Sequence, residues 1–293
     1  MVKFSVVIPT YESSGVIGRA IDSLNRQTYK EFEVLFVDDR SRDYEGLRKV
    51  VESTSGFKYS ILQLTRHVNQ VESRKVGIAA ASGDFVCFLD HDDFWEPRKL
   101  DLLHSLIESE RFSSEKIFYH QLRCQGNDGR EFFYPRRGIA PRESVAEYLF
   151  VSNGMMQSSA LAIPISIAKN LPFNSDAVPH DDWDLVLQAY KQGVSFRYID
   201  HALATWSVRR MIGVSPRDSS DVSLRWFAQR VDLFDKAGTV GFLLNVVFPK
   251  QVAEKKYSAA LGTLFTSFRL QPLFAGRASL SLARRFFIKF GAR

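Results

Sequence analysis

The chain has 293 residues, 45% of them hydrophobic, so it can bury a sizeable core and is not mainly disordered. Two cysteines are too few for a disulfide framework or a cysteine-rich metal site, and they favour a reducing compartment. The net charge is +6, yet residues 216–293 hold 13 Lys and Arg against 5 Asp and Glu, whereas residues 1–215 hold 26 against 28. The basic surplus therefore belongs to the C-terminal quarter, which argues against a chain that coats nucleic acid along its whole length.

The N-terminus runs from Met1 directly into a strand-like segment, without the apolar region and small-residue cleavage site of a signal peptide. The most apolar stretch, residues 239–248, is shorter than the roughly 18–20 residues that a transmembrane helix needs. We therefore expect a cytoplasmic protein that does not span a bilayer.

Strands and helices alternate over residues 1–110. The apolar runs predict strands at 4–9, 32–37, 59–64 and 85–89, and helical spacing predicts helices at 15–27, 44–53, 71–81 and from 97. This alternation predicts an α/β fold with a mostly parallel sheet flanked by helices, in which ligands bind beyond the carboxyl ends of the strands. The strand ends are polar and mostly acidic in this sequence.

The pattern is weaker after residue 110. Strands are expected at 117–122, 131–134, 158–163 and 196–199, and helices at 144–150 and 182–192. From residue 224 the chain is predicted to be mostly helical, with breaks at Pro249 and Pro272.

The strongest chemical signal is the run Asp90-His91-Asp92-Asp93 at the end of the fourth strand. Carboxylates packed at a strand end repel one another unless a cation neutralises them. A hard divalent ion, Mg²⁺ or Mn²⁺, suits oxygen ligands and keeps positions open for phosphate and water. The alternative is an acidic helix start, in which Asp92 or Asp93 caps the helix near Pro97.

Two further strand ends carry polar groups. At the second, Asp38-Asp39 can accept a hydrogen bond from a nucleobase imide or a ribose hydroxyl, although a turn with local backbone acceptors is the simpler interpretation. The first strand is followed by Thr10, Tyr11 and Glu12. No G-x-G-x-x-G follows that strand and no G-x-x-x-x-G-K-[ST] occurs, which argues against a dinucleotide-binding Rossmann domain and a P-loop NTPase.

A fourth acidic group, Asp181 and Asp182, begins the helix expected at 182–192. Acidic residues at a helix N-terminus interact favourably with the helix dipole, so a structural role is a real alternative. The functional interpretation is a general base that removes a proton from an acceptor hydroxyl.

These motifs together resemble family 2 glycosyltransferases with the GT-A fold. The resemblance is carried by residues 5–12, 23–28, 37–41 and 81–93, whose order and spacing make it specific, and it continues more weakly at 171–174 and 181–185. The last part of the chain, about 80 residues, resembles the family in its general character but carries no matching motif. The implied fold is a Rossmann-like, mostly parallel sheet flanked by helices, with a helical C-terminal extension.

The resemblance implies an inverting, metal-dependent enzyme of the hexosyltransferase type, which uses a nucleotide-sugar donor, usually a UDP-sugar, with Mn²⁺ or Mg²⁺. Asp92 and Asp90 match the D-x-D motif, with Asp92 the better candidate for direct metal contact. Asp182 matches the catalytic base, and Asp181 the Glu that usually stands beside it. The donor-binding positions implied are Pro9, Thr10, Glu12, Asp39, Arg66, Arg74, Asp90, His91 and Arg209.

The sequence also departs from the family pattern. Val76 stands where the family often has Asn, and the Q-x-x-R-W motif of processive members is absent. Residues 205–210 stand where many members have Tyr-Arg-x-His. Arg209 could still neutralise diphosphate charge there, and the alternative is a solvated loop arginine.

The resemblance divides the chain into a nucleotide-sugar-binding half at 1–110, an acceptor-binding half with the base at 111–215, and a basic amphipathic helical region at 216–293. The expected acceptor is a hydroxyl of a glycan, a lipid-linked sugar or a cell-envelope polysaccharide. Asn153, Gln157 and Tyr134 are candidate acceptor contacts. A nucleotidyltransferase is the alternative enzyme, but it would carry a glycine-rich basic loop after the first strand. A nucleic-acid-binding module would leave the acidic strand ends unexplained.

The C-terminal region indicates a further partner. Residues 236–293 hold ten Lys and Arg and one acid, Glu254, interleaved with apolar and aromatic residues. Basic amphipathic helices of this kind bind anionic membrane surfaces. We therefore expect peripheral attachment to the inner face of the cell membrane. The alternative is that these helices pack on the catalytic domain or form a dimer interface, so an oligomer also fits.

Overall fold

A computed structural model describes residues 1–110, 113–126, 131–208 and 218–272. The chain divides into two compact units, each described by itself below. The first, which we call the sheet unit, comprises Met1–Gly138, Met156–Ser175 and Asp181–Arg210. The second, the helical unit, comprises Ile139–Met155, Asp176–His180 and Met211–Arg293.

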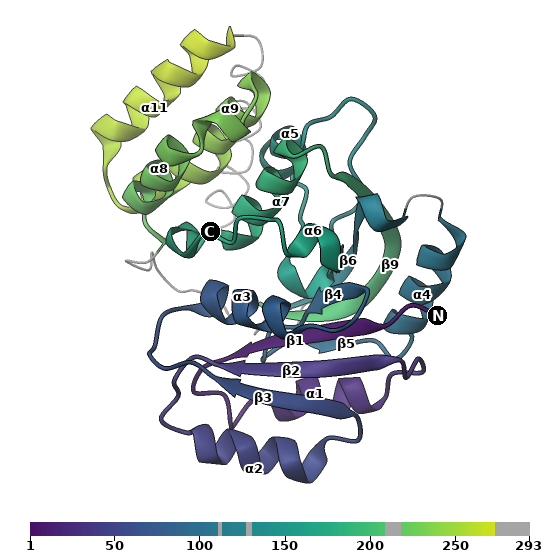
Figure 1. Ribbon diagram of the computed structural model, residues 1–293. Helices are drawn as coiled ribbons and strands as arrows, with labels where there is room; N and C mark the ends of the chain where they lie inside the picture. Colours follow the sequence, from purple (N-terminus) through teal and green to yellow (C-terminus); the bar gives the residue numbers. More distant parts are fainter. Residues whose placement is uncertain (111–112, 127–130, 209–217, 273–293) are drawn as a thin grey trace. The chain divides into compact units, whose positions relative to one another are not determined.

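The sheet unit contains one mixed sheet. Its strands are β1 (Phe4–Thr10), β2 (Phe32–Asp38), β3 (Lys58–Gln63), β4 (Phe85–Phe88), β5 (Phe94–Trp95), β6 (Lys116–Gly126), β7 (Glu131–Tyr134), β8 (Leu161–Pro164) and β9 (Ser195–Val208). The order is β3-β2-β1-β4-β8-β6-β9-β5, and β7 pairs with β6 (Figure 1). β3, β2, β1 and β4 are parallel, and β8 pairs antiparallel to both β4 and β6. The expected α/β fold is confirmed.

Helices cover both faces of the parallel strands. The helices of the sheet unit are α1 (Gly18–Asn25), α2 (Tyr44–Thr54), α3 (Gln70–Ala80), α4 (Lys99–Ser109), α6 (Ile165–Ala168) and α7 (Asp181–Lys191). All seven residues of β1 and of β2 are buried, because helices cover both faces of these strands. This burial explains why both segments are mostly apolar in the sequence. Right-handed crossovers place α1 and α2 on one face and α3 on the other, because the strand order reverses at β1 (Figure 1).

Helix α3 approaches β1 closely because residue 77 is glycine. A Cβ atom on Gly77 would lie 2.3 Å from Cγ1 of Val7. Asn69 caps the helix, since its side-chain oxygen accepts from the backbone N–H groups of Val71 (3.0 Å) and Glu72 (3.2 Å). The cap and the close packing fix the direction of Arg74, which is 4% exposed.

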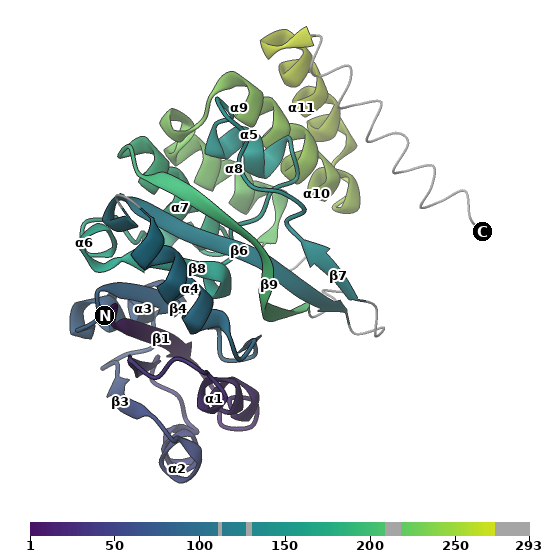
Figure 2. The same cartoon turned by 90° about the vertical axis from the view of Figure 1, so that its right-hand side faces the viewer.

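The second half of the sheet is built on two long strands, β6 and β9, which lie side by side (Figure 2). β9 runs from Ser195 to Val208, whereas the sequence predicted only residues 196–199. The pairing of β6 with β9 shifts register around Gln121. Such a shift breaks the period-two alternation on which strand prediction depends, so the continuation of β9 has no clear sequence signal.

The helical unit confirms the expected helical C-terminal region. Its helices are α5 (Val145–Phe150), α8 (Ser220–Gln229), α9 (Lys236–Phe242), α10 (Phe248–Ala253) and α11 (Tyr257–Leu270), with a π-helical turn at Leu243–Val247. Phe242 lies at the centre of its core, with ring centroids 5.1 Å from Phe150 and 5.5 Å from Trp226. Pro249 does not break the helical run as predicted, because it lies in the first turn of α10, where its missing N–H costs little.

Candidate functional site

Three neighbouring parallel strands bring the acidic motifs to one edge of the sheet. Thr10, the last residue of β1, pairs with Asp38 at the end of β2. On the other side of β1, the N–H of Leu89 donates to the carbonyl of Val7 (3.1 Å), just before the Asp90 turn. The carboxyl ends of β1, β2 and β4 are therefore adjacent, as the sequence predicted.

The two aspartates that end β2 have different surroundings. Asp38 is fully buried and accepts from the N–H (2.9 Å) and the hydroxyl of Ser41, and from Nε2 of Gln63 (3.1 Å). It therefore builds the turn. Asp39 accepts from the N–H of Val68 (2.7 Å), and its Oδ2 lies 3.0 Å from Nδ1 of His67.

An aromatic pair stands beside Asp39. The rings of Tyr11 and His67 stack with centroids 4.2 Å apart, and their side chains are partly exposed. Glu12 has a positive φ of 48°, and its Oε1 accepts from the N–H of Arg42 (3.0 Å). Thr10 is buried, and its hydroxyl has no hydrogen-bond partner among the described residues. The exposed ring face and the Asp39 carboxylate are suited to a flat, polar ligand such as a nucleobase.

The acidic turn after β4 is held from inside the sheet unit. Asp93 is buried, and its carboxylate accepts from the Ser159 hydroxyl (2.7 Å) and the Ser207 N–H (3.1 Å). Burial, together with the charge of Asp90, raises the pKa of Asp93 to about 8. The alternative that Asp92 or Asp93 caps the next helix is wrong, because α4 begins after Arg98 with no side-chain cap.

Asp92 and His91 are half-buried in the same turn. The backbone carbonyl of Asp92 accepts from Nη2 of Arg19 (3.1 Å) and the hydroxyl of Ser207 (3.0 Å), so the turn is anchored on two sides. No group of three His, Cys, Asp or Glu side chains in the described parts of the chain is arranged as a metal site. The carboxylates of Asp90 and Asp92 are hard oxygen donors, which fit Mg²⁺ or Mn²⁺ if phosphate and water supply the remaining ligands.

Arg74 connects the acidic turn to the start of α7. Its Nη2 lies 2.9 Å from Oδ1 of Asp90, its Nη1 forms an ion pair with Asp181, and Nη1 is 3.9 Å from Oδ1 of Asp182. Burial alone would lower the pKa of Arg74, but the charges of Asp90 and Asp181 raise it above its usual value. The guanidinium is thus held by the protein's own carboxylates.

Asp181 and Asp182 lie next to each other but differ in their partners. Asp181 is ion-paired with Arg74 and accepts from Nε2 of Gln70 at both oxygens (3.1 Å each). Asp182 accepts from the hydroxyl of Ser158, and its side chain is 29% exposed. Burial among protein groups, and then the charge of Asp181, raise the pKa of Asp182 to about 7. Asp182 therefore has the proton affinity of a general base that works near neutral pH.

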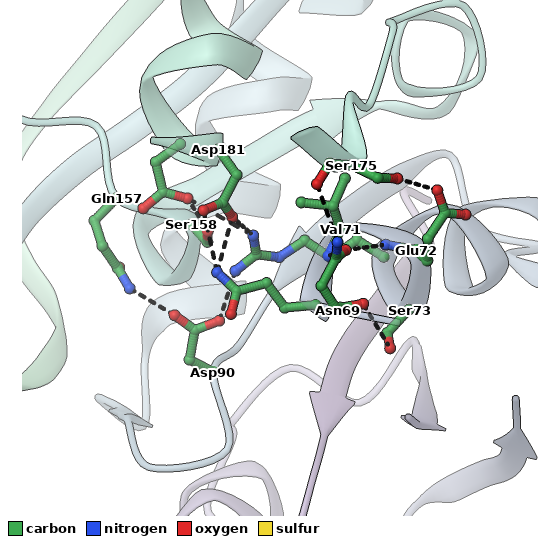
Figure 3. Close-up of polar contacts among 12 residues, drawn as sticks. Asn69, Val71, Glu72, Ser73, Asp90, Gln157, Ser158, Ser175 and Asp181 are labelled. Atoms are coloured by element: carbon green, nitrogen blue, oxygen red, sulfur yellow. Dashed lines mark hydrogen bonds and ion pairs between the residues drawn. The ribbon is translucent and has the colours of Figure 1, made fainter. Parts of the chain in front are cut away.

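Several polar residues of the site had no sequence motif. Gln157, Ser158 and Ser159 precede β8 and contact the acidic groups, and Figure 3 shows Gln157 beside Asp90. Lys99, fully buried in α4, donates to the carbonyl of Ser159 (2.6 Å). Gln70 could have been found, because its spacing of four residues from Arg74 places both on one face of a helix.

The other residues singled out in the sequence are spread over the chain. Pro9 is buried in β1, and Arg66 is exposed between β3 and α3. Tyr134 ends β7, and Asn153 belongs to the helical unit, with a positive φ of 59°. Arg209 lies outside the described residues.

Comparison with known proteins identifies the family. The profile of glycosyl transferase family 2 matches residues 5–146. The amylovoran biosynthesis glycosyltransferase AmsB of Erwinia amylovora is 36% identical over 230 residues, which cover 77% of this chain and 76% of AmsB. WfgD of Escherichia coli, a UDP-Glc:alpha-D-GlcNAc-diphosphoundecaprenol beta-1,3-glucosyltransferase, is 31% identical over 103 residues, 35% of this chain and 40% of WfgD.

Among solved structures, S. aureus TarS 1-349 in complex with UDP-GlcNAc matches with a TM-score of 0.59 and 22% identity, covering 92% of this chain and 76% of that one. This likeness shows the fold, which is of the GT-A type. The chain belongs to glycosyl transferase family 2.

Proposed function

We propose that this glycosyltransferase inverts the anomeric centre as it moves a sugar from a UDP-sugar to a hydroxyl of a glycan, a lipid-linked sugar or a cell-envelope polysaccharide. The supporting observation is that Arg74 contacts both Asp90 and Asp181 within the sheet unit. The acidic turn, expected to meet the donor, and Asp182, expected to activate the acceptor, therefore belong to one reaction centre. AmsB acts in amylovoran biosynthesis, and TarS was solved with UDP-GlcNAc, which supports the substrate classes.

In this mechanism Asp182 removes the proton of the acceptor hydroxyl as that oxygen attacks the anomeric carbon. Asp181 is held by Arg74 and Gln70, and its negative charge raises the proton affinity of Asp182. A single displacement needs one base, whereas glycoside hydrolysis generally needs two carboxyl groups flanking the bond. Inversion follows because the acceptor attacks opposite the leaving group.

The donor is held at the strand ends. Asp39 and the Tyr11 ring would contact the nucleoside, together with Thr10 and Glu12 of the adjoining loop; the supporting observation is that Tyr11 stacks on His67, whose ring contacts Asp39. Asp90 and Asp92 would hold a divalent cation, and the cation would offset the charge of the leaving diphosphate. Of the other implied contacts, Arg74 is engaged by carboxylates, whereas Arg66 is exposed.

The assay is release of UDP from UDP-glucose, UDP-GlcNAc and other common donors by the purified full chain with Mn²⁺ or Mg²⁺. We expect turnover of at least one donor, its loss with EDTA, and its loss in Asp182→Asn, which keeps the shape of the side chain but cannot take the proton. Transfer at the wild-type rate by Asp182→Asn would show that Asp182 is not the base.

We also infer that the C-terminal region contacts an anionic membrane surface. No helix in the described part of the chain is both long and apolar enough to cross a bilayer. The apolar residues Phe242, Leu244 and Val247 are buried within the helical unit. In α11, by contrast, large apolar side chains that recur every three or four residues are exposed: Tyr257, Leu261, Phe265 and Phe268.

The sequence supports an anionic lipid surface as the partner of this region, because residues 236–293 carry ten basic residues and one acidic residue. The test is co-sedimentation of the full chain with phosphatidylglycerol vesicles and with phosphatidylcholine vesicles. We expect binding to the anionic vesicles, weakened by Phe265→Glu but not by the control Phe132→Glu, which alters an exposed phenylalanine of β7. Self-association of the chain without binding to either kind of vesicle would overturn the inference.

A further inference from the structure

Three consecutive residues, Gln157–Ser159, contact both acidic groups of the reaction centre. Nε2 of Gln157 donates to Oδ2 of Asp90 (2.9 Å) and to Oδ2 of Asp93 (3.3 Å), and Figure 3 shows Gln157 reaching Asp90. The hydroxyl of Ser159 accepts from the N–H of Asp90 (3.0 Å) and donates to Asp93 (2.7 Å). The first and third residues therefore hold the turn after β4.

The middle residue contacts the other group. The hydroxyl of Ser158 donates to Oδ1 of Asp182. No described residue forms a hydrogen bond with Oδ2 of Asp182. One oxygen of the carboxylate is thus fixed, and the other can accept a proton from a bound hydroxyl.

The segment is itself anchored from the interior of the sheet unit. The carbonyl of Ser159 accepts from Nζ of Lys99 (2.6 Å) and Nε1 of Trp95 (3.2 Å), and that Nζ lies 3.7 Å from the centroid of the Trp95 ring. The N–H of Ser159 donates to Oε1 of Gln157 (2.8 Å). A buried polar network whose members are satisfied is rigid, so the segment can act as a fixed reference.

We propose that Gln157–Ser159 is a positioning element of the reaction centre, in which Gln157 and Ser159 fix the turn that meets the donor, while Ser158 orients the base and stabilises its ionised form. The proposal rests on the proposed function, which assigns Asp182 as the base and the Asp90 turn to the donor. It adds that one three-residue segment sets the geometry of both groups.

The effect of Ser158 is measurable because other groups oppose it. The charged groups that act on Asp182 are Asp181 of its own helix, Arg74 of α3 and Asp90 of the acidic turn. Burial and the two aspartates raise the pKa of Asp182, whereas Arg74 and the hydrogen bond from Ser158 lower it. Removal of a hydrogen bond to a charged group should shift that pKa upward by about one to two units.

The first experiment measures kcat/KM against pH for the full chain, by release of UDP from UDP-glucose or UDP-GlcNAc. We expect Ser158→Ala to move the acid limb of the profile upward by about one to two pH units. Ser158→Thr, which keeps the hydroxyl, should restore the wild-type limb. The matched control is Ser105→Ala, an exposed serine of α4 that bonds only within its own helix among the described residues; it should leave the profile unchanged.

The second experiment separates the two roles. Gln157→Ala should raise the KM for the UDP-sugar by about tenfold or more, because removal of a side chain that orients a ligand-binding group commonly weakens binding by that much. The acid limb of the profile should stay at the wild-type pH. If Ser158→Ala leaves the limb in place while Asp182→Asn is inactive, the positioning proposal is overturned. If Asp182→Asn is fully active, the proposed base itself is wrong, and the role of Ser158 is overturned with it.

Discussion

Replacement of Arg74 by methionine tests whether one buried cation stabilises the acidic groups of the proposed reaction centre. The side chain of Arg74 is 5% exposed, and those of its partners Asp181 and Asp90 are 8% and 28% exposed. Removal of one partner from a buried ion pair costs about 3–5 kcal/mol, because the remaining charge is left uncompensated. Asp90 can be partly hydrated, so we expect the lower end, about 3 kcal/mol, or a more than 100-fold change in the folded-to-unfolded ratio.

The loss of stability in Arg74→Met should depend on pH. Without Arg74 the pKa of Asp182, already raised, should rise further, because Arg74 is one of the groups that lower it. A carboxyl whose pKa is higher in the folded than in the unfolded chain binds more protons when folded, so the free energy of unfolding falls as pH rises between the two values. The difference between Arg74→Met and the wild type should therefore be smaller near pH 5 than near pH 8.

The assay is urea unfolding followed by fluorescence at both pH values. The control is Arg48→Met, which removes an exposed arginine 3.3 Å from Glu45 and 3.7 Å from Glu52 on α2, where a loss of about 0–1 kcal/mol is expected. A loss in Arg74→Met no larger than that of the control, or one that does not change with pH, would refute the view that Arg74 neutralises the acidic groups.

Three other outcomes are expected. The kcat/KM of the wild type should rise tenfold per pH unit below about 7 and then level off, because Asp182 must be ionised; a flat profile would contradict this. Gly77→Ala should lower the free energy of unfolding by about 1–3 kcal/mol, because the new Cβ atom would overlap Val7. Gly262→Ala in α11, where a Cβ atom would meet nothing within 4 Å, should leave the melting temperature unchanged or raise it. Burial lowers the pKa of Lys99 to about 7, so the free energy of unfolding of the wild type should rise with pH above 7 relative to that of Lys99→Met. The rise should be at most about 1.4 kcal/mol per pH unit in urea titrations. An equal dependence on pH in the two proteins would contradict this expectation.

The sequence predicted the first half of the fold well, because its signals are local. A buried parallel strand such as β1 is a nearly continuous apolar run. β1, β2 and β3 are each followed by a helix with its own periodicity, and β4 is followed by the short β5 and then α4. Since parallel strands end at the same edge, the acidic strand ends at Asp39 and Asp90 could be expected to lie together.

The second half was less predictable, since its elements depend on partners distant in sequence. β9 continues to Val208 because it pairs with β6 across a register shift, and the segment 196–199 was all that its alternation showed. The break expected at Pro249 was wrong because Pro249 falls in the first turn of α10, where a missing N–H costs little.

The sequence by itself determined which residue types carry the chemistry and which strands present them: carboxylates at the ends of β2 and β4, and at the start of α7. Only the tertiary structure decided which groups each of them contacts. Arg74, expected at the donor, is held between Asp90 and Asp181, and Gln157, expected at the acceptor, is bonded to Asp90 and Asp93. The physical reason is that the proton affinity and orientation of a carboxylate depend on burial and on neighbours brought close by folding, which a pattern along the chain does not record.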